Sequence, residues 1–145
     1  MAIRGAVLIL SIAAALWAHN PAHLEQLLST KSCPGCDLRG AHLKGEELTR
    51  ANLKDADLRG ANLEEVNLEG ADLKRCRLEG SFANSGNFRS AQLQGAVLEK
   101  GFFGRANFSD ADLSGASLKG AYLVDATFSG AVMRNTTGGP ANVSP

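Results

Sequence analysis

The residues best suited to chemistry are two cysteines separated by two positions, in the segment Cys33-Pro34-Gly35-Cys36. The same spacing occurs in disulfides that close a short turn, in thiol redox centres, in haem attachment sites and in zinc sites. Haem attachment requires a histidine after the second cysteine, where this chain has Asp37, and zinc requires a second pair of ligands. We therefore favour a structural disulfide between the two cysteines, with a thiol redox or metal-binding site as the alternative.

Other ligand types do not gather elsewhere in the sequence. The remaining candidates are His19, His23, His42 and Cys76. No Gly-rich phosphate loop precedes a helical segment. The sequence therefore predicts no catalytic residue, no metal and no cofactor, and we expect a protein that is not an enzyme.

The overall charge of the chain is balanced, with 15 Lys and Arg against 15 Asp and Glu in 145 residues, a length that suits one domain. A nucleic-acid surface needs clustered Lys and Arg, and the sequence has no such cluster. We expect no nucleic-acid partner.

The first 18 residues have the features of a secretory signal peptide. Arg4 supplies a positive charge, and an apolar run from Ala6 to Trp17 follows. This run is shorter than the ~20 residues of a spanning helix, and small residues close it, so we expect cleavage after Ala15 or Ala18. Export would leave the mature protein free of the membrane and outside the reducing cytosol, where a disulfide persists.

A five-residue period dominates the rest of the chain. Large apolar residues recur at Leu38, Leu43, Leu48, Leu53, Leu58, Leu63, Leu68, Leu73, Leu78, Phe88, Leu93, Leu98, Phe103, Phe108, Leu113, Leu118, Leu123, Phe128 and Met133, with Ala83 as the single exception. Two residues before most of them stands Ala or another small residue, and two residues after stands Gly, Asp or Asn at many positions. A period of five fits neither a helix nor a strand, so the chain must turn every five residues to bring each large residue inward.

The repeating units resemble the pentapeptide-repeat family. Matching units read Ala56-Asp-Leu-Arg-Gly60, Ala71-Asp-Leu-Lys-Arg75 and Ala111-Asp-Leu-Ser-Gly115. The resemblance implies an all-β solenoid, a right-handed quadrilateral β-helix with four units per coil and about five coils over residues 37–135. The sequence CPGCDL after a helix also resembles exported or thylakoid-lumenal members from cyanobacteria and chloroplasts, which implies the periplasm or the thylakoid lumen.

The two ends of the predicted solenoid differ. Asn20 and Pro21 are typical of a helix start, and we expect an amphipathic helix over 21–31, within a segment 19–36 that ends in the CPGC turn. This helix would form an N-terminal α-helical cap on the first coil. Residues 136–145 are polar and predict a flexible tail, so the last coil could form an end-to-end homodimer.

One column on the outer surface contains aromatic residues in three consecutive predicted coils. Steps of 20 lead from Phe82 to Phe102 and Tyr122, and Val124 lies close to the last. Either Phe82 bends inward to fill the space beside Ala83, or the column forms a docking strip for a protein partner. In other columns, the pairs Asp55/Arg75 and Arg105/Asp125 predict ion pairs between neighbouring coils.

These features predict a non-enzymatic structural or interaction scaffold with an unknown protein partner. Thiol redox or metal binding through CPGC is the alternative. The resemblance also implies a third function, the DNA mimicry by which some family members inhibit topoisomerases. That function suits a strongly acidic cytoplasmic rod, and this chain is neutral.

Overall fold

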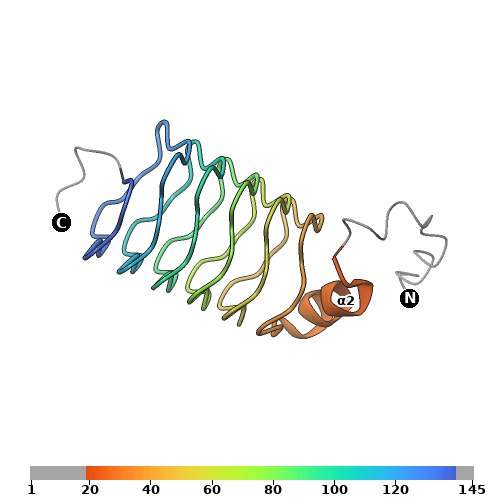
Figure 1. The fold of residues 1–145 in the computed structure, drawn as a ribbon. Helices are drawn as coiled ribbons and strands as arrows, with labels where there is room; N and C mark the ends of the chain where they lie inside the picture. The colour runs from red at the N-terminus through yellow and green to blue at the C-terminus, as the bar shows by residue number, and fades with distance from the viewer. Residues whose placement is uncertain (1–18, 140–145) are drawn as a thin grey trace.

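The computed structural model describes residues 19–139, which form one helix followed by a solenoid (Figure 1). The predicted signal peptide over 1–18 and the last six residues, 140–145, lie outside the described residues. No helix within 19–139 is long and apolar enough to cross a membrane.

Helix α2, Pro21–Thr30, begins and ends with the residue types expected of helix termini. The Asn20 side chain accepts a hydrogen bond from the Ala22 N–H at 3.0 Å, and Pro21 stands in the first turn, where its missing N–H costs nothing. Lys31 adopts a left-handed conformation with φ of 57° and closes the helix. The helix thus ends one residue before the predicted boundary, because residue 31 is already its terminal turn.

Helix α2 packs against one end of the solenoid. Leu27 is completely buried, and Leu24 and Leu28 pack against the same core. Hydrogen bonds join the helix segment to the first coil, and two of them involve Asp37: the Asn20 N–H donates to the Asp37 carbonyl at 3.0 Å, and the Asp37 N–H donates to Nδ1 of His23 at 2.9 Å.

The solenoid repeats every 20 residues. Parallel bridges pair each outward residue with the residue 20 positions later, from Ser32 with Asn52 to Ser117 with Thr137. Each face of a coil contributes a single bridge, because the chain turns after every five residues. The predicted 20-residue coil is therefore confirmed, and the ladder extends over 32–137, beyond the predicted 37–135 at both ends.

Each corner of the coil requires a left-handed residue. Every fifth residue from Gly35 to Asn135 has φ between 54° and 72°. Ten of these 21 positions are glycine, and the others include Asp55 and Ser90, which adopt this conformation at some cost.

The frequent Asn or Asp before each large residue has a specific role. Its side-chain oxygen accepts a hydrogen bond from the N–H two residues later, at 2.9–3.3 Å, which fixes the turn. Nine units have this bond, from Asp37, Asn52, Asp57, Asn62, Asn67, Asp72, Asn87, Asn107 and Asp112. The polar column therefore stabilises the corners that the core column requires.

The core of the solenoid is a stack of large side chains with one phenylalanine cluster. The large column is buried from Leu38 to Leu118. The rings of Phe88, Phe108 and Phe128 stack on consecutive coils, with centroids 5.0 and 5.1 Å apart. Phe103 packs against Phe88 at 5.9 Å, edge to face. This cluster lies where the leucine column is interrupted.

Two glycines make room for this cluster. A Cβ atom at Gly86 would lie 2.8 Å from Cε2 of Phe88, and a Cβ atom at Gly101 would collide with the Phe103 ring. Both glycines stand in the column that elsewhere contains alanine. Glycine in place of alanine removes one methyl group at each position, and this makes room for the phenylalanine ring in the core.

The end of the solenoid away from α2 is less covered. Leu123, Phe128 and Met133 in the last coil are only partly buried. Thr137 still pairs with Ser117, and the Thr136 hydroxyl donates to the Leu113 carbonyl at 2.9 Å. The prediction of a flexible tail from 136 is therefore wrong for residues 136 and 137, because both complete the last coil.

Candidate functional site

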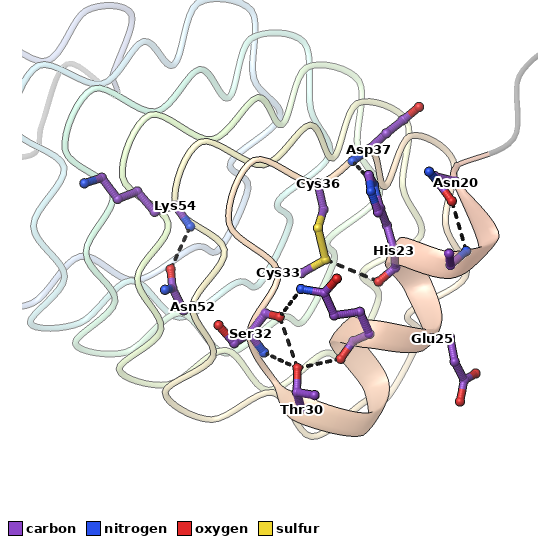
Figure 2. The surroundings of a disulfide bond; sticks show 12 residues. Asn20, His23, Glu25, Thr30, Ser32, Cys33, Cys36, Asp37, Asn52 and Lys54 are labelled. Atoms are coloured by element: carbon purple, nitrogen blue, oxygen red, sulfur yellow. Dashed lines mark hydrogen bonds between the residues drawn. A yellow bond between two sulfur atoms is a disulfide. The ribbon is translucent and has the colours of Figure 1, made fainter.

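The two CPGC cysteines are joined as a disulfide beneath α2 (Figure 2), with their Cα atoms 5.5 Å apart. Cys33 stands in the column of large residues and Cys36 in the column of small residues. Pro34 and Gly35 form the corner between them, and the Gly35 N–H donates to the Lys54 carbonyl of the next coil at 2.8 Å. The cysteine pair therefore forms a regular repeat unit and belongs to the first coil rather than to a separate turn.

The surroundings of the disulfide are closed. Cys33 is completely buried and Cys36 is 4% exposed. The carbonyl oxygen of His23 lies 3.3 Å from the Cys33 sulfur, and the Gln26 side chain donates to the Ser32 carbonyl at 2.9 Å. Figure 2 shows His23 on the helix beside the two sulfurs. In this arrangement a redox partner would reach the sulfurs only after α2 moved.

The remaining ligand-type residues are also engaged or isolated. Within residues 19–139, no group of three or more His, Cys, Asp and Glu side chains could hold a metal ion. His23 uses Nδ1 to accept from the Asp37 backbone. The arrangement offers neither a metal site nor a proton-transfer pair in the described part of the chain.

Cys76 is a buried free thiol. It lies in the small-residue column, and its sulfur donates to the Leu53 carbonyl at 2.7 Å. Burial raises the pKa of the Cys76 thiol to about 12. The thiol is therefore protonated at neutral pH and is a poor nucleophile in the folded protein.

The aromatic strip, defined here as Phe82, Phe102, Tyr122 and Val124, is the main exposed apolar surface of the described residues. The four residues are 44%, 42%, 51% and 53% exposed. Phe82 and Phe102 stack with centroids 5.3 Å apart and planes 1° from parallel. The interpretation that Phe82 fills the space beside Ala83 is wrong, because its ring is 44% exposed and stacks on Phe102 at the outer surface.

Tyr122 continues the strip in a different orientation. Its ring covers Gly104, where an added Cβ atom would lie 2.9 Å from the Tyr122 Cε1 atom. Gly104 is buried by this contact. The position of the Tyr122 ring in the strip thus requires glycine at residue 104, although other repeat units have various residue types at the corresponding position.

The strip replaces residues that stabilise corners elsewhere. Phe has no acceptor for the turn hydrogen bond that Asn or Asp provides at the same position, and the Tyr122 hydroxyl stands at the far end of its ring from the backbone. The N–H of Gly104 instead donates to the Asn84 side chain of the preceding coil at 2.9 Å, whereas within residues 19–139 the N–H groups of Asn84 and Val124 have no protein acceptor. Three consecutive coils therefore lack this bond in exchange for exposed aromatic surface.

Comparison with known proteins identifies the repeat. The family model "Pentapeptide repeats" matches eight copies, at residues 32–70, 71–110, 86–123 and 106–137. No curated protein matches the chain.

Solved structures of pentapeptide-repeat proteins resemble the chain to different degrees. The pentapeptide repeat protein Rfr23 from the cyanobacterium Cyanothece 51142 is 29% identical with a TM-score of 0.66, and the match covers 80% of this chain and 97% of Rfr23. The protein alr5209 from Nostoc PCC 7120 is also 29% identical, with a TM-score of 0.50 and coverage of 57% and 64%. AT2G44920 from the Arabidopsis thaliana thylakoid lumen is 26% identical with a TM-score of 0.30, over 73% of this chain and 64% of its own.

The family's fold is a right-handed quadrilateral β-helix. The square 20-residue coil, the buried leucine column and the match from residue 32 to residue 137 agree with that fold. The chain belongs to the pentapeptide-repeat family.

Proposed function

We propose that this protein is a non-enzymatic scaffold that binds another protein through the aromatic strip. The observation that carries the proposal is that Phe82, Phe102 and Tyr122, which lie in three consecutive coils, are 44%, 42% and 51% exposed. Exposed aromatic side chains supply large contact areas at interfaces. Nine other units have Asn or Asp with the turn bond at this position, whereas Arg77, Val97 and Ser117 also lack it, so the strip is distinguished by its exposed aromatic surface.

The experiment compares partner capture by two variants of the protein from its native compartment. Phe102→Ser with Tyr122→Ser removes the centre of the strip, and Asn67→Ser with Asn87→Ser is the matched control on another face. We expect the strip variant to lose partners that the wild type and the control retain, with circular dichroism showing that all three are folded. Unchanged capture by the strip variant would remove the proposal.

The proposal places the scaffold outside the cytosol, in the periplasm or the thylakoid lumen, with a static disulfide between Cys33 and Cys36. The apolar N-terminal run and the burial of both sulfurs support this placement. N-terminal sequencing of the native protein tests cleavage after Ala15 or Ala18. Counting reactive thiols in buffers that span physiological reduction potentials tests the disulfide. If Cys33 and Cys36 change between the reduced and the oxidised form over this range, the redox function is favoured instead.

We also propose different roles for the two ends. Helix α2 acts as the N-terminal cap, since Leu27 is inserted into the core. At the other end, the partly exposed Leu123, Phe128 and Met133 could form an end-to-end homodimer. Neither the neutral composition nor the strip favours the DNA-mimic function.

A further inference from the structure

The first coil of the solenoid has no preceding coil with which its backbone can pair. In the second coil, the Asp57 N–H donates to the Cys36 carbonyl at 2.9 Å, and the Asp57 carbonyl accepts from the Leu38 N–H at 2.8 Å. Asp37 occupies the position of Asp57 one coil earlier. Its N–H and carbonyl groups therefore need partners from outside the solenoid.

Helix α2 and the residue before it supply both partners. The Asn20 N–H donates to the Asp37 carbonyl at 3.0 Å, and the Asp37 N–H donates to Nδ1 of His23 at 2.9 Å (Figure 2). Nδ1 of His23 thus takes the place that a backbone carbonyl has in the second coil. A carbonyl accepts at every pH in the physiological range, whereas an imidazole nitrogen that binds a proton becomes a donor. The ladder therefore ends in an acceptor that acid removes.

The other two histidines of the chain lie at the same junction. His19 precedes α2, and its Nδ1 atom is buried without a hydrogen-bond partner among residues 19–139. Burial lowers the pKa of His19, and the positive charge of His42 on the first coil lowers it further, whereas the charge of Asp37 raises it. The Asp37 carboxylate is itself engaged by Arg39, whose Nε atom lies 2.8 Å away. The folded junction therefore favours neutral histidine.

The direction of the pH dependence follows from these contacts. The unfolded chain protonates His19 at the ordinary pKa of 6.5, whereas the folded junction holds the pKa below that value. This contribution to stability is therefore lost as the pH falls through 6.5. Protonation of His23 acts in the same direction, because its Nδ1–H would face the Asp37 N–H as a second donor. Glu25, the acidic side chain of α2, points away from the first coil and does not offset these charges (Figure 2).

Ion pairs do not hold α2 in place. Among residues 19–139, no ion pair connects the helix segment to the solenoid. Ion pairs join residues of the coils instead, as in the predicted pair of Asp55 and Arg75 at 2.7 Å, whereas the predicted pair of Arg105 and Asp125 does not form. Hydrogen bonds and apolar packing therefore hold the helix, and the histidine contact is the part that a proton can break.

We propose that α2 is an acid-sensitive cap, which His23 helps to hold on the first coil at neutral pH and which is released as the junction histidines bind protons. This inference rests on the proposed role of α2 as the cap. Release uncovers the disulfide of Cys33 and Cys36, which lies beneath the helix. The cap thus makes access to the buried sulfurs depend on the pH of the surroundings.

The first test measures how fast a water-soluble trialkylphosphine reduces this disulfide in the full chain. Each reaction converts the phosphine and one water molecule into a phosphine oxide and yields two thiols, which are alkylated and counted by mass spectrometry in a Cys76→Ala background. His23→Asn is the matched variant, because Oδ1 of asparagine is bonded to Cγ, as Nδ1 is in histidine, and does not titrate. The ratio of the two rates at each pH cancels the pH dependence of the reagent.

The expected result is a pH-dependent ratio. Between about pH 8 and about pH 5, the range in which histidine titrates, the rate for the protein with His23 should rise about tenfold relative to that of His23→Asn, the effect of losing one hydrogen bond. Circular dichroism at both pH values checks that the solenoid stays folded in both proteins. A constant ratio would overturn the acid-sensitive cap.

Leu27→Ala separates the pH response from the cap itself. It removes a fully buried side chain of α2, so at about pH 8 it should accelerate reduction by at least about tenfold. If it does so while the ratio for His23→Asn stays constant, α2 is a cap without a histidine switch, and only the further inference fails. If Leu27→Ala leaves the rate unchanged, the proposed cap fails as well.

A second measurement follows the hydrogen bond directly. In an NMR titration between about pH 8 and about pH 5, the amide resonance of Asp37 should move together with the ring resonances of His23. The same amide should stay in place in His23→Asn. An Asp37 amide that does not follow the His23 ring would overturn the proposed switch.

Discussion

At the scale of single residues, Cys76 shows how the repeat uses a side chain that could have been reactive. The small-residue column contains a thiol here in place of a methyl group, and the Leu53 carbonyl accepts a hydrogen bond from it. That carbonyl also accepts from the Ala56 N–H at 3.0 Å, so replacement of Cys76 by Ala leaves no buried acceptor unpaired. The thiol thus contributes packing rather than chemistry.

Stability at alkaline pH should depend on this thiol. The folded state raises the thiol pKa from 9.0 to about 12, so the folded protein keeps the proton to higher pH than the unfolded chain. The associated stabilisation is complete below pH 9 and is lost as pH rises towards 12. At pH 10.5 we expect the wild type to have lost about 2 kcal/mol of unfolding free energy more than Cys76→Ala since pH 7.5.

Urea titrations of both proteins at these two pH values measure the difference. Because Lys and Tyr titrate alike in both proteins, their contributions cancel. An equal loss of stability in the two proteins would contradict the buried-thiol interpretation.

Single residues also show what could be read from the sequence. The period predicted which residues point inward, because only a turn every five residues satisfies it. It did not decide whether Phe82 points outward, because a small residue at Ala83 leaves a space that a neighbouring aromatic ring could enter. A column of residues 20 apart does not reveal such lateral packing.

At the scale of elements, the phenylalanine cluster links the core to the small-residue column. Gly86 and Gly101 stand two residues before Phe88 and Phe103, whose rings would meet an alanine methyl group.

The start of the solenoid was predicted at Asp37, because Cys33 and Cys36 differ in type from the leucine and alanine of the other repeat units. In the structure, Cys33 occupies the large-residue column and Cys36 the small-residue column, so the first repeat unit begins before Asp37.

Gly101→Ala should be destabilising because of the Phe103 ring. Overpacking of a core typically costs about 1–3 kcal/mol, and we expect a loss in this range by urea unfolding. Phe103→Leu in the same protein should recover most of that loss, because the shorter side chain frees the space.

A double-mutant cycle separates this effect from backbone strain. If Gly101→Ala costs the same with Phe103 and with Leu at that position, the contact with the ring is not the cause. Ala96→Gly, in the same column beside a leucine, is the control and should be destabilising rather than neutral.

At the scale of the whole molecule, the two ends of the rod differ in protection. Helix α2 covers the first coil, whereas Leu123 and Met133 in the last coil are partly exposed. Each coil is bonded only to its neighbours, so local opening can begin at an end and need not involve the whole chain.

Amide hydrogen exchange should therefore begin in residues 121–137 and reach residues 32–60 last. Leu27→Ala, which removes a fully buried side chain of α2, should accelerate exchange in the first coil and leave the last coil unchanged. Mass spectrometry of peptides from both ends measures this. Uniform exchange along the rod would contradict end-initiated opening.

The 20-residue register also determines how the molecule responds to tension. One coil advances the rod by only ~4.8 Å, yet its 20 residues span roughly 66–72 Å when pulled straight. Force applied to the C-terminal end would thus detach one coil at a time, and each detachment would lengthen the tether by more than ten times the coil's own rise. Under tension, such a rod would extend in equal steps of one coil, while the coils that remain folded continue to bear the force.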